Sequence, residues 1–178
     1  MKLYHLKILL ESEEIVFRDL LVNENHDLEA LHRAILSSFG FKGKEMASFI
    51  KTDDNWEALA EYTLEAISEE SKAKLMKDAK ISEVFSKEGD TLDYIYDYLN
   101  EWKFNLELLK IEEAEPIDQI KEVGSHGKAP DENERSLTGK DAESILTNAI
   151  LGDEFEEEEE DDLFDEGFES LDDYEEYL

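Results

Sequence analysis

The C-terminal 27 residues, from Gly152 to Leu178, constrain the fold more than any other segment. They carry 16 carboxylates and no Lys, Arg or His. Like charges at this density repel one another and resist burial in a core. The core must therefore come from the first 151 residues, which suffice for one ordinary domain. We interpret residues 1–124 as a globular domain, 125–151 as a linker with a short helix, and 152–178 as a disordered or partly helical acidic tail.

Charge narrows the range of partners. The chain has a formal net charge of −31, and residues 1–151 alone hold 33 acids against 18 bases. A protein that binds nucleic acid directly needs a basic face that displaces counterions from the phosphates, and this chain has the opposite sign. We therefore expect no direct contact with nucleic acid. A partner protein with a basic surface, such as a nucleic-acid-binding protein, fits the charge better.

The sequence also bears on cellular location. Without cysteine, the chain can form neither a disulfide framework nor a thiolate metal site. Lys7 and Glu11 interrupt the apolar run near the N-terminus, and no later stretch approaches the roughly 18 apolar residues that a membrane span needs. We expect a cytoplasmic protein that does not contact membranes.

One apolar stripe predicts a helix over residues 28–39. Asp27 precedes the stripe as an N-cap candidate, and Gly40 follows it as a stop signal. The residues of the stripe recur at helical spacing and form one face of the predicted helix. The stripe consists of Leu28, Leu31, His32, Ile35, Leu36 and Phe39.

Period-two alternation predicts strands in most of the remaining domain. Residues 4–10 and 15–22 read as two strands, and residues 46–64 as two more around a turn at 53–55. A hairpin follows, with alternating residues at 92–98 and again at 102–108.

Two other segments read differently. Residues 69–78 are charged and helix-prone, and we expect an exposed excursion. Residues 124–130 contain two glycines and a proline and read as a loop. Taken together, these patterns predict an α+β fold, with a mainly antiparallel sheet packed against one long amphipathic helix.

Three of these segments together resemble a known family. They are Arg18–Val22 leading into Asp27–Ile35, then Phe39-Gly40-Phe41, and finally Tyr94–Trp102. The likeness to the plasmid pRiA4b ORF-3-like family covers roughly residues 1–130. It is strongest to an acidic-tailed branch of Bacteroidetes-type bacteria, whose members are often labelled as passengers of a mobile element.

The resemblance implies a compact α+β domain, whose sheet carries the long helix, and no established activity. This chain departs from the family pattern at three places. Leu99 and Asn100 stand where the hairpin turn has Gly and Asp, Glu45-Met46-Ala47 replaces a histidine-rich stretch, and Phe104 replaces a frequent His. If relatives use those histidines for a metal or a reaction, this chain lacks them.

His32, Asp97 and Trp102 are the candidate functional residues of the domain. We expect His32 to be a hydrogen-bonded histidine at the edge of the core. The alternative is a metal ligand or pH-sensitive group that faces Asp97. Near the hairpin turn, Asp97 is placed to accept hydrogen bonds from backbone N–H groups. Trp102 fits cross-strand packing better than a platform for nucleobases, because Lys103 is the only base between Leu92 and Leu109.

No pattern in the chain indicates catalytic, cofactor-binding or metal-binding residues. The four histidines never occur at metal-ligand spacing. The Gly139-Lys140 pair lacks both the upstream glycine and the following Ser or Thr of a phosphate-binding loop. We therefore predict a non-enzymatic protein without a cofactor. A small metal-dependent or hydrolytic enzyme that uses His32 and Asp97 is an alternative.

The tail carries apolar residues among its acids, which a purely solubilising tail does not need. Docking of the tail on a basic partner, or shielding of a basic surface, would use both kinds of side chain. One alternative is a disordered, solvated tail that tunes solubility and blocks nonspecific contact. The other, which is the first alternative for the function of the whole protein, is nucleic-acid mimicry; it requires a helical tail because only a helix brings the charges close enough together. The aromatic candidates for docking are Phe155, Phe164, Phe168, Tyr174 and Tyr177.

Overall fold

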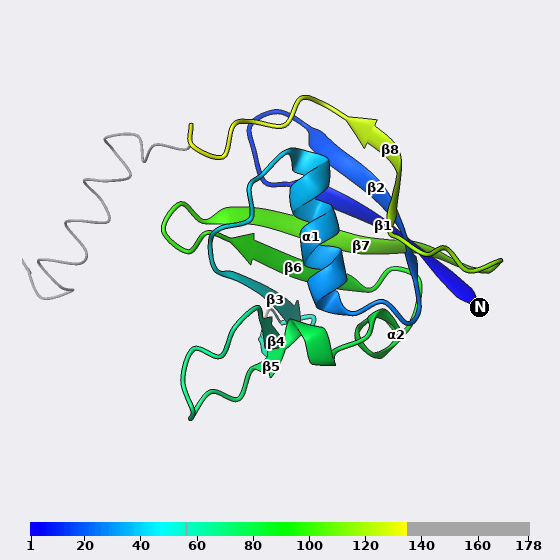
Figure 1. Cartoon of the computed structure of the whole chain (residues 1–178), viewed down its shortest axis with the longest axis horizontal. Helices are drawn as coiled ribbons and strands as arrows, with labels where there is room; N and C mark the ends of the chain where they lie inside the picture. The colour runs from blue at the N-terminus through cyan, green and yellow to red at the C-terminus, as the bar shows by residue number, and fades with distance from the viewer. Residues whose placement is uncertain (56, 135–178) are drawn as a thin grey trace, which may run out of the picture. The chain divides into compact units, whose positions relative to one another are not determined.

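The computed structural model describes residues 1–55 and 57–134 (Figure 1). Within these residues, eight strands form one sheet in the order β5-β4-β3-β6-β7-β1-β2-β8. The elements are β1 (Lys2–Leu10), β2 (Val16–Asn23), α1 (Leu28–Phe39), β3 (Ala47–Thr52), β4 (Ala58–Thr63), β5 (Lys74–Leu75), η1 (Met76–Asp78), α2 (Ile81–Val84), β6 (Thr91–Tyr96), β7 (Trp102–Glu113) and β8 (Lys121–His126).

The centre of the sheet follows the period-two pattern of the sequence. β7 pairs antiparallel with β6 on one side and with β1 on the other. Alternate side chains of these strands are buried, including Leu6 and Ile8 of β1 and Leu106 and Leu108 of β7. The apolar half of each alternation therefore forms one continuous core face.

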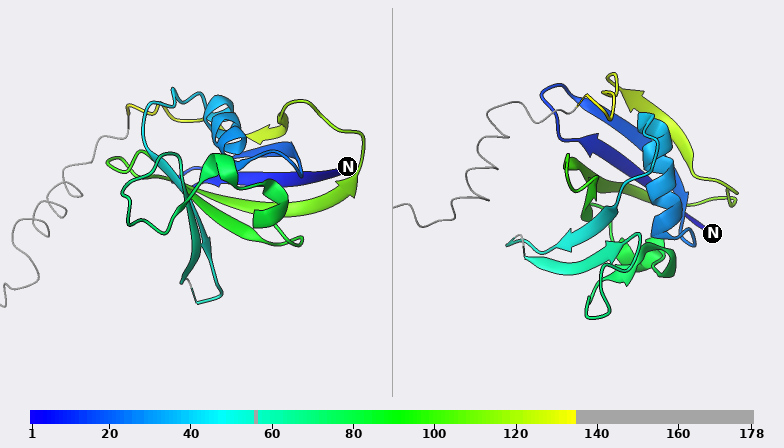
Figure 2. Two further views of the ribbon diagram at one scale, coloured as in Figure 1. Left: turned by 60° about the horizontal axis from the view of Figure 1, so that its bottom comes forward. Right: turned by 60° about the vertical axis from the view of Figure 1, so that its left-hand side comes forward.

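Helix α1 packs against this core face (Figure 2). The side chain of Asp27 accepts a hydrogen bond from the Ala30 N–H at 2.7 Å and caps the first turn. Gly40 ends the helix in the left-handed conformation at φ 74°. Phe39, in the last turn, meets the ring of Phe104 on β7, with the ring centroids 4.9 Å apart.

The predicted fold class is wrong. The sheet is mixed, because β4 and β5 pair in parallel while its other neighbouring strands pair antiparallel. Among the described residues, α1 is the one helix of seven residues or more. It spans the predicted residues 28–39, but with 12 residues it is not the long helix of the predicted fold class. Gly40 ends the helix as soon as the apolar stripe ends, and most other described elements are strands. The domain is an eight-stranded mixed sheet, with the short helix α1 packed on one face.

Two local predictions also need correction. Residues 69–78 were expected to be an exposed, helix-prone excursion, but β5 and η1 fold there and Met76 is completely buried. Residues 124–126 were expected to lie in a loop but belong to β8, which pairs with β2. In both places, pairing with a neighbouring strand outweighs the local composition.

Hydrogen bonds hold the residues after β8 near the C-terminal end of α1. The carboxylate of Glu132 accepts hydrogen bonds from the Lys42 N–H at 2.8 Å and from the Tyr96 hydroxyl at 3.2 Å. Arg18, buried under α1, donates to the carbonyls of His126 and Gly127 at 3.0 and 3.2 Å. Polar contacts therefore hold residues 127–132 against the domain.

Some sequence-based predictions fall on other parts of the chain. The linker beyond residue 134, the acidic tail and its aromatic residues lie outside the described residues. Where the chain is described, none of its helices combines the length and apolar character required to cross a membrane.

Candidate functional site

His32 lies on the buried face of α1. The residue is 4% exposed, and its Nδ1 atom lies 2.7 Å from the hydroxyl of Tyr94 on β6. Burial disfavours the charged ring and lowers the pKa of His32 to about 4, with smaller and opposing effects from Glu29 and Arg33. The ring is therefore neutral at physiological pH.

An open cleft of about 630 Å³ adjoins His32 between α1 and the residues that follow it. Its walls combine acids and bases rather than one sign of charge. Among the described residues, no group of three or more His, Cys, Asp or Glu side chains is placed to hold a metal ion. The lining includes Glu29, His32, Arg33, Lys42, Leu64 and Glu65.

Asp97 has a different environment. It lies in the β6–β7 turn at φ 59°, a left-handed conformation that Asp tolerates better than most residues. Its carboxylate accepts hydrogen bonds from the backbone N–H groups of Leu99 and Asn100 at 3.1 and 3.3 Å, and from the Asn100 side chain at 2.7 Å. Asp97 is not among the residues that line the His32 cleft. The structure therefore does not bring the two together in that cleft.

Trp102 packs into the core. The residue is 5% exposed, and its ring centroid lies 5.0 Å from that of Phe41. In the sheet it stands opposite Tyr96 across the β6–β7 ladder. A flat surface on which bases could stack would need exposed aromatic faces, whereas Trp102 and Tyr96 are both buried.

The face of the sheet opposite α1, here called the open face, carries a groove of about 550 Å³. The groove crosses four adjacent strands, β3, β6, β7 and β1. Strand pairing places its floor in one row, because Leu9 is opposite Asn105, Asn105 is opposite Asp93, and Asp93 is opposite Ile50. Ile95 and Lys103 form a neighbouring pair in the same groove.

The sequence patterns did not indicate this groove, although part of the signal was present. Leu9 and Ile95 are apolar at positions where the alternation of their strands would place polar side chains. Leu9 is 40% exposed. What the sequence could not supply is the order of the strands, which brings Leu9 and Ile50 into one row although they are far apart in the chain.

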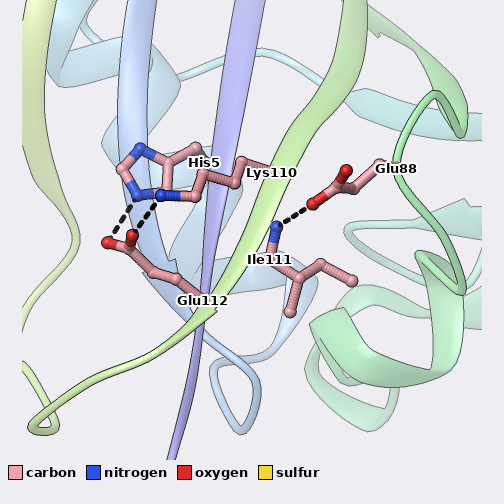
Figure 3. Close-up of polar contacts among 5 residues, drawn as sticks. All are labelled: His5, Glu88, Lys110, Ile111 and Glu112. Atoms are coloured by element: carbon pink, nitrogen blue, oxygen red, sulfur yellow. Dashed lines mark hydrogen bonds and ion pairs between the residues drawn. The ribbon is translucent and has the colours of Figure 1, made fainter.

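A charged cluster lies beside the bulge between β1 and β7 (Figure 3). Glu112 binds His5 Nε2 at 2.9 Å with one oxygen and Lys110 Nζ at 2.7 Å with the other. The hydrogen bond from Lys110 has the largest effect and that from His5 the next largest, and together they lower the pKa of Glu112 to about 2. The Glu88 side chain accepts the Ile111 N–H at 3.0 Å. Because these side chains are partly solvated, we assign the cluster to strand pairing rather than to chemistry.

Comparison with known proteins gives a family and a fold. A family model described as plasmid pRiA4b ORF-3-like protein matches residues 2–173. A crystal structure of a protein of unknown function from Methanosarcina mazei Go1 is similar, with a TM-score of 0.64 and 20% sequence identity. The match covers 83% of this chain and 82% of that chain, and at this identity it shows the fold alone. No curated protein matches the sequence significantly.

Proposed function

The chain belongs to the plasmid pRiA4b ORF-3-like family, whose description assigns no activity, and we propose that it is a non-enzymatic, cytoplasmic protein-interaction module. In this proposal a partner protein binds the open face of the sheet. The acidic tail strengthens the contact by docking on a basic surface of the same partner, or shields such a surface. The groove on the open face is the observation that carries the proposal.

The groove has the character of a docking surface. Leu9, Ile50 and Ile95 contribute apolar surface, while Asp93 and Asn105 form a hydrogen bond of 3.0 Å between them. Apolar surface that is concave and bordered by polar groups is typical of sites where proteins meet. The core face on the opposite side of the sheet packs against α1 (Figure 2).

The geometry of the two candidate residues supports a binding role over an enzymatic one. The carboxylate of Asp97 is engaged by the turn that it stabilises, and His32 is hydrogen-bonded to Tyr94. An acid–base pair would need both side chains to reach one substrate. The nucleic-acid mimic remains a prediction that depends on tail residues outside the described part of the chain.

Capture from bacterial lysate by three forms of the full chain tests the proposal. The forms are the wild type, Ile95→Lys in the groove, and Ile67→Lys on an exposed loop residue outside it. Both substitutions replace isoleucine by lysine and change the net charge equally. We expect a protein that the wild type and Ile67→Lys retain and that Ile95→Lys retains at least tenfold less.

Two results would contradict this proposal. Equal retention by all three forms would show that the open face is not the binding surface. If retention instead disappears only when the chain ends at Leu151, the tail is the binder. Circular dichroism and thermal unfolding of each variant control for loss of the fold.

A further inference from the structure

Resting on the proposed function, we propose that the groove of the open face binds an extended partner segment with the pattern apolar–x–Lys/Arg–x–apolar. The two apolar side chains would contact Leu9 and Ile50, and the basic side chain would meet Asp93. The row of paired residues across the sheet determines the spacing of the two apolar residues in the partner segment. The acids around the groove determine that the residue between them is basic.

The spacing follows from the strand order. Leu9 and Ile50 stand at the two ends of a row that crosses β1, β7, β6 and β3. Neighbouring strands lie about 4.8 Å apart, so three steps separate these side chains by roughly 14 Å. An extended segment rises about 3.3 Å per residue, and residues i and i+4 are then roughly 13 Å apart on the same side of the segment. Residue i+2 faces the middle of the row.

The middle of the row favours a basic side chain. Asp93 lies there, with one carboxylate oxygen accepting from the Asn105 amide. Glu11 lines the same groove, and Glu61 stands opposite Ile50 on β4, so that acids surround the row. The one lysine that lines the groove, among the described residues, is Lys103, whose Nζ lies 3.6 Å from a carboxylate oxygen of Glu101. A partner Lys or Arg would find a net negative surface.

The net negative charge of the chain disfavours a second copy of the chain as the occupant of the groove. Each chain has a formal net charge of −31, so that two copies repel one another. A basic and apolar segment of another protein meets no such repulsion. Charge complementarity therefore selects a foreign partner for this groove.

Three labelled twelve-residue peptides test the pattern by fluorescence anisotropy with the full chain. They share Gly/Ser flanks and differ only in the centre, which is Leu-Thr-Arg-Thr-Leu, Leu-Thr-Glu-Thr-Leu or Ala-Thr-Arg-Thr-Ala. The wild type is compared with Leu9→Thr, with Asp93→Asn, and with Asp118→Asn on an exposed residue outside the groove. Asp93→Asn keeps an oxygen that can accept from Asn105, and Asp118→Asn removes the same charge elsewhere.

We expect the wild type to bind the Leu/Arg peptide at least tenfold more tightly than the other two. Asp93→Asn and Leu9→Thr should each weaken that binding about tenfold, the size of one charge-assisted contact or one buried apolar side chain. Asp118→Asn should stay within twofold of the wild type. Because every form keeps the tail, nonspecific attraction to the tail is common to all of them.

Several outcomes would overturn the inference. They are equal binding of the Arg and Glu peptides, equal effects of Asp93→Asn and Asp118→Asn, or no binding at millimolar peptide. Self-association of the wild type that Leu9→Thr abolishes would instead make the groove a homodimer interface. If one of the three peptide results overturns this inference, capture from lysate that depends on Ile95 would still support the proposed function. Failure of the peptide pattern can therefore be distinguished from failure of the proposed function.

Discussion

The Nδ1 atom of His32 on α1 lies 2.7 Å from the hydroxyl oxygen of Tyr94 on β6. This buried contact joins the helix to the centre of the sheet across 62 positions of sequence. Burial raises the pKa of Tyr94 well above its ordinary value and lowers that of His32. Both groups are therefore neutral at pH 7, and their hydrogen bond is one between uncharged partners.

The first prediction concerns the pH dependence of stability. The pKa of His32 is about 4 in the folded protein and 6.5 ordinarily, so the unfolded chain binds more protons between these values. The free energy of unfolding should therefore fall as pH drops from about 6.5 to 4, by about 3 kcal/mol from this residue. Chemical denaturation at several pH values measures it.

The control for this prediction is His32→Gln, which has no titratable ring. The difference in unfolding free energy between wild type and variant should change across pH 4 to 6.5 and level off below it. Glu112 has a folded pKa of about 2 against an ordinary 4.5, so its contribution is lost at lower pH and is common to both proteins. A difference that does not vary with pH would refute the assignment.

The second prediction concerns the β6–β7 turn. Asp97→Ala removes the acceptor of two backbone N–H groups and one side-chain amide, and should cost roughly 1–3 kcal/mol of unfolding free energy. Asp97→Asn keeps an acceptor oxygen and tolerates a positive φ, so its cost should be smaller. Equal destabilisation by Ala and Asn in urea titrations would contradict this account of the turn.

The third prediction compares two glycines with similar backbone angles. Gly40 and Gly127 have φ values of 74° and 76°, but only Gly127 is crowded. A Cβ atom at Gly127 would lie 2.4 Å from the Ile15 carbonyl oxygen, whereas at Gly40 nothing lies within 4 Å. Gly40→Ala should cost about 1–2 kcal/mol, which is the left-handed backbone penalty, and Gly127→Ala should cost clearly more. Thermal unfolding that ranks them equally would rule out the steric contribution.

The fourth prediction concerns the buried arginine of β2. Arg18 donates to the carbonyls of Phe17, Ser38, His126 and Gly127, and its guanidinium lies 4.9 Å from the Phe39 ring centroid. Arg18→Lys keeps the charge but cannot reproduce the planar fork, so we expect a loss of about 2–4 kcal/mol. The exposed Arg33 gives a matched control, in which Arg33→Lys should change stability by less than about 0.5 kcal/mol. Similar losses at both sites would show that the fork geometry is unimportant.

Local elements were more predictable than their arrangement. The apolar stripe, the Asp27 cap and Gly40 located α1, because capping and amphipathicity act within a few residues. The alternation at 92–98 and 102–108 likewise located β6 and β7. Failures occurred where distant strands decided the outcome, as in β8, which pairs with β2, and in β5, which pairs in parallel with β4.

The candidate site shows the same division. The sequence singled out His32 and Asp97 as polar residues in apolar or turn contexts, but could not say that His32 pairs with Tyr94 while Asp97 binds its own turn. The groove went unnoticed because its residues come from four strands. No local pattern connects Leu9 with Ile50.

The sequence alone determined the acidic character, the lack of thiol chemistry, and the helix and strands whose signals lie within a dozen residues. Periodicity and capping are short-range effects, so they survive without knowledge of the fold. Only the tertiary structure decided the strand order, the mixed pairing, and the single face that α1 covers. These features depend on which apolar faces pack together when the segments that carry them are far apart in the chain. Because α1 packs on one face of the sheet, the open face remains uncovered, and the groove lies there.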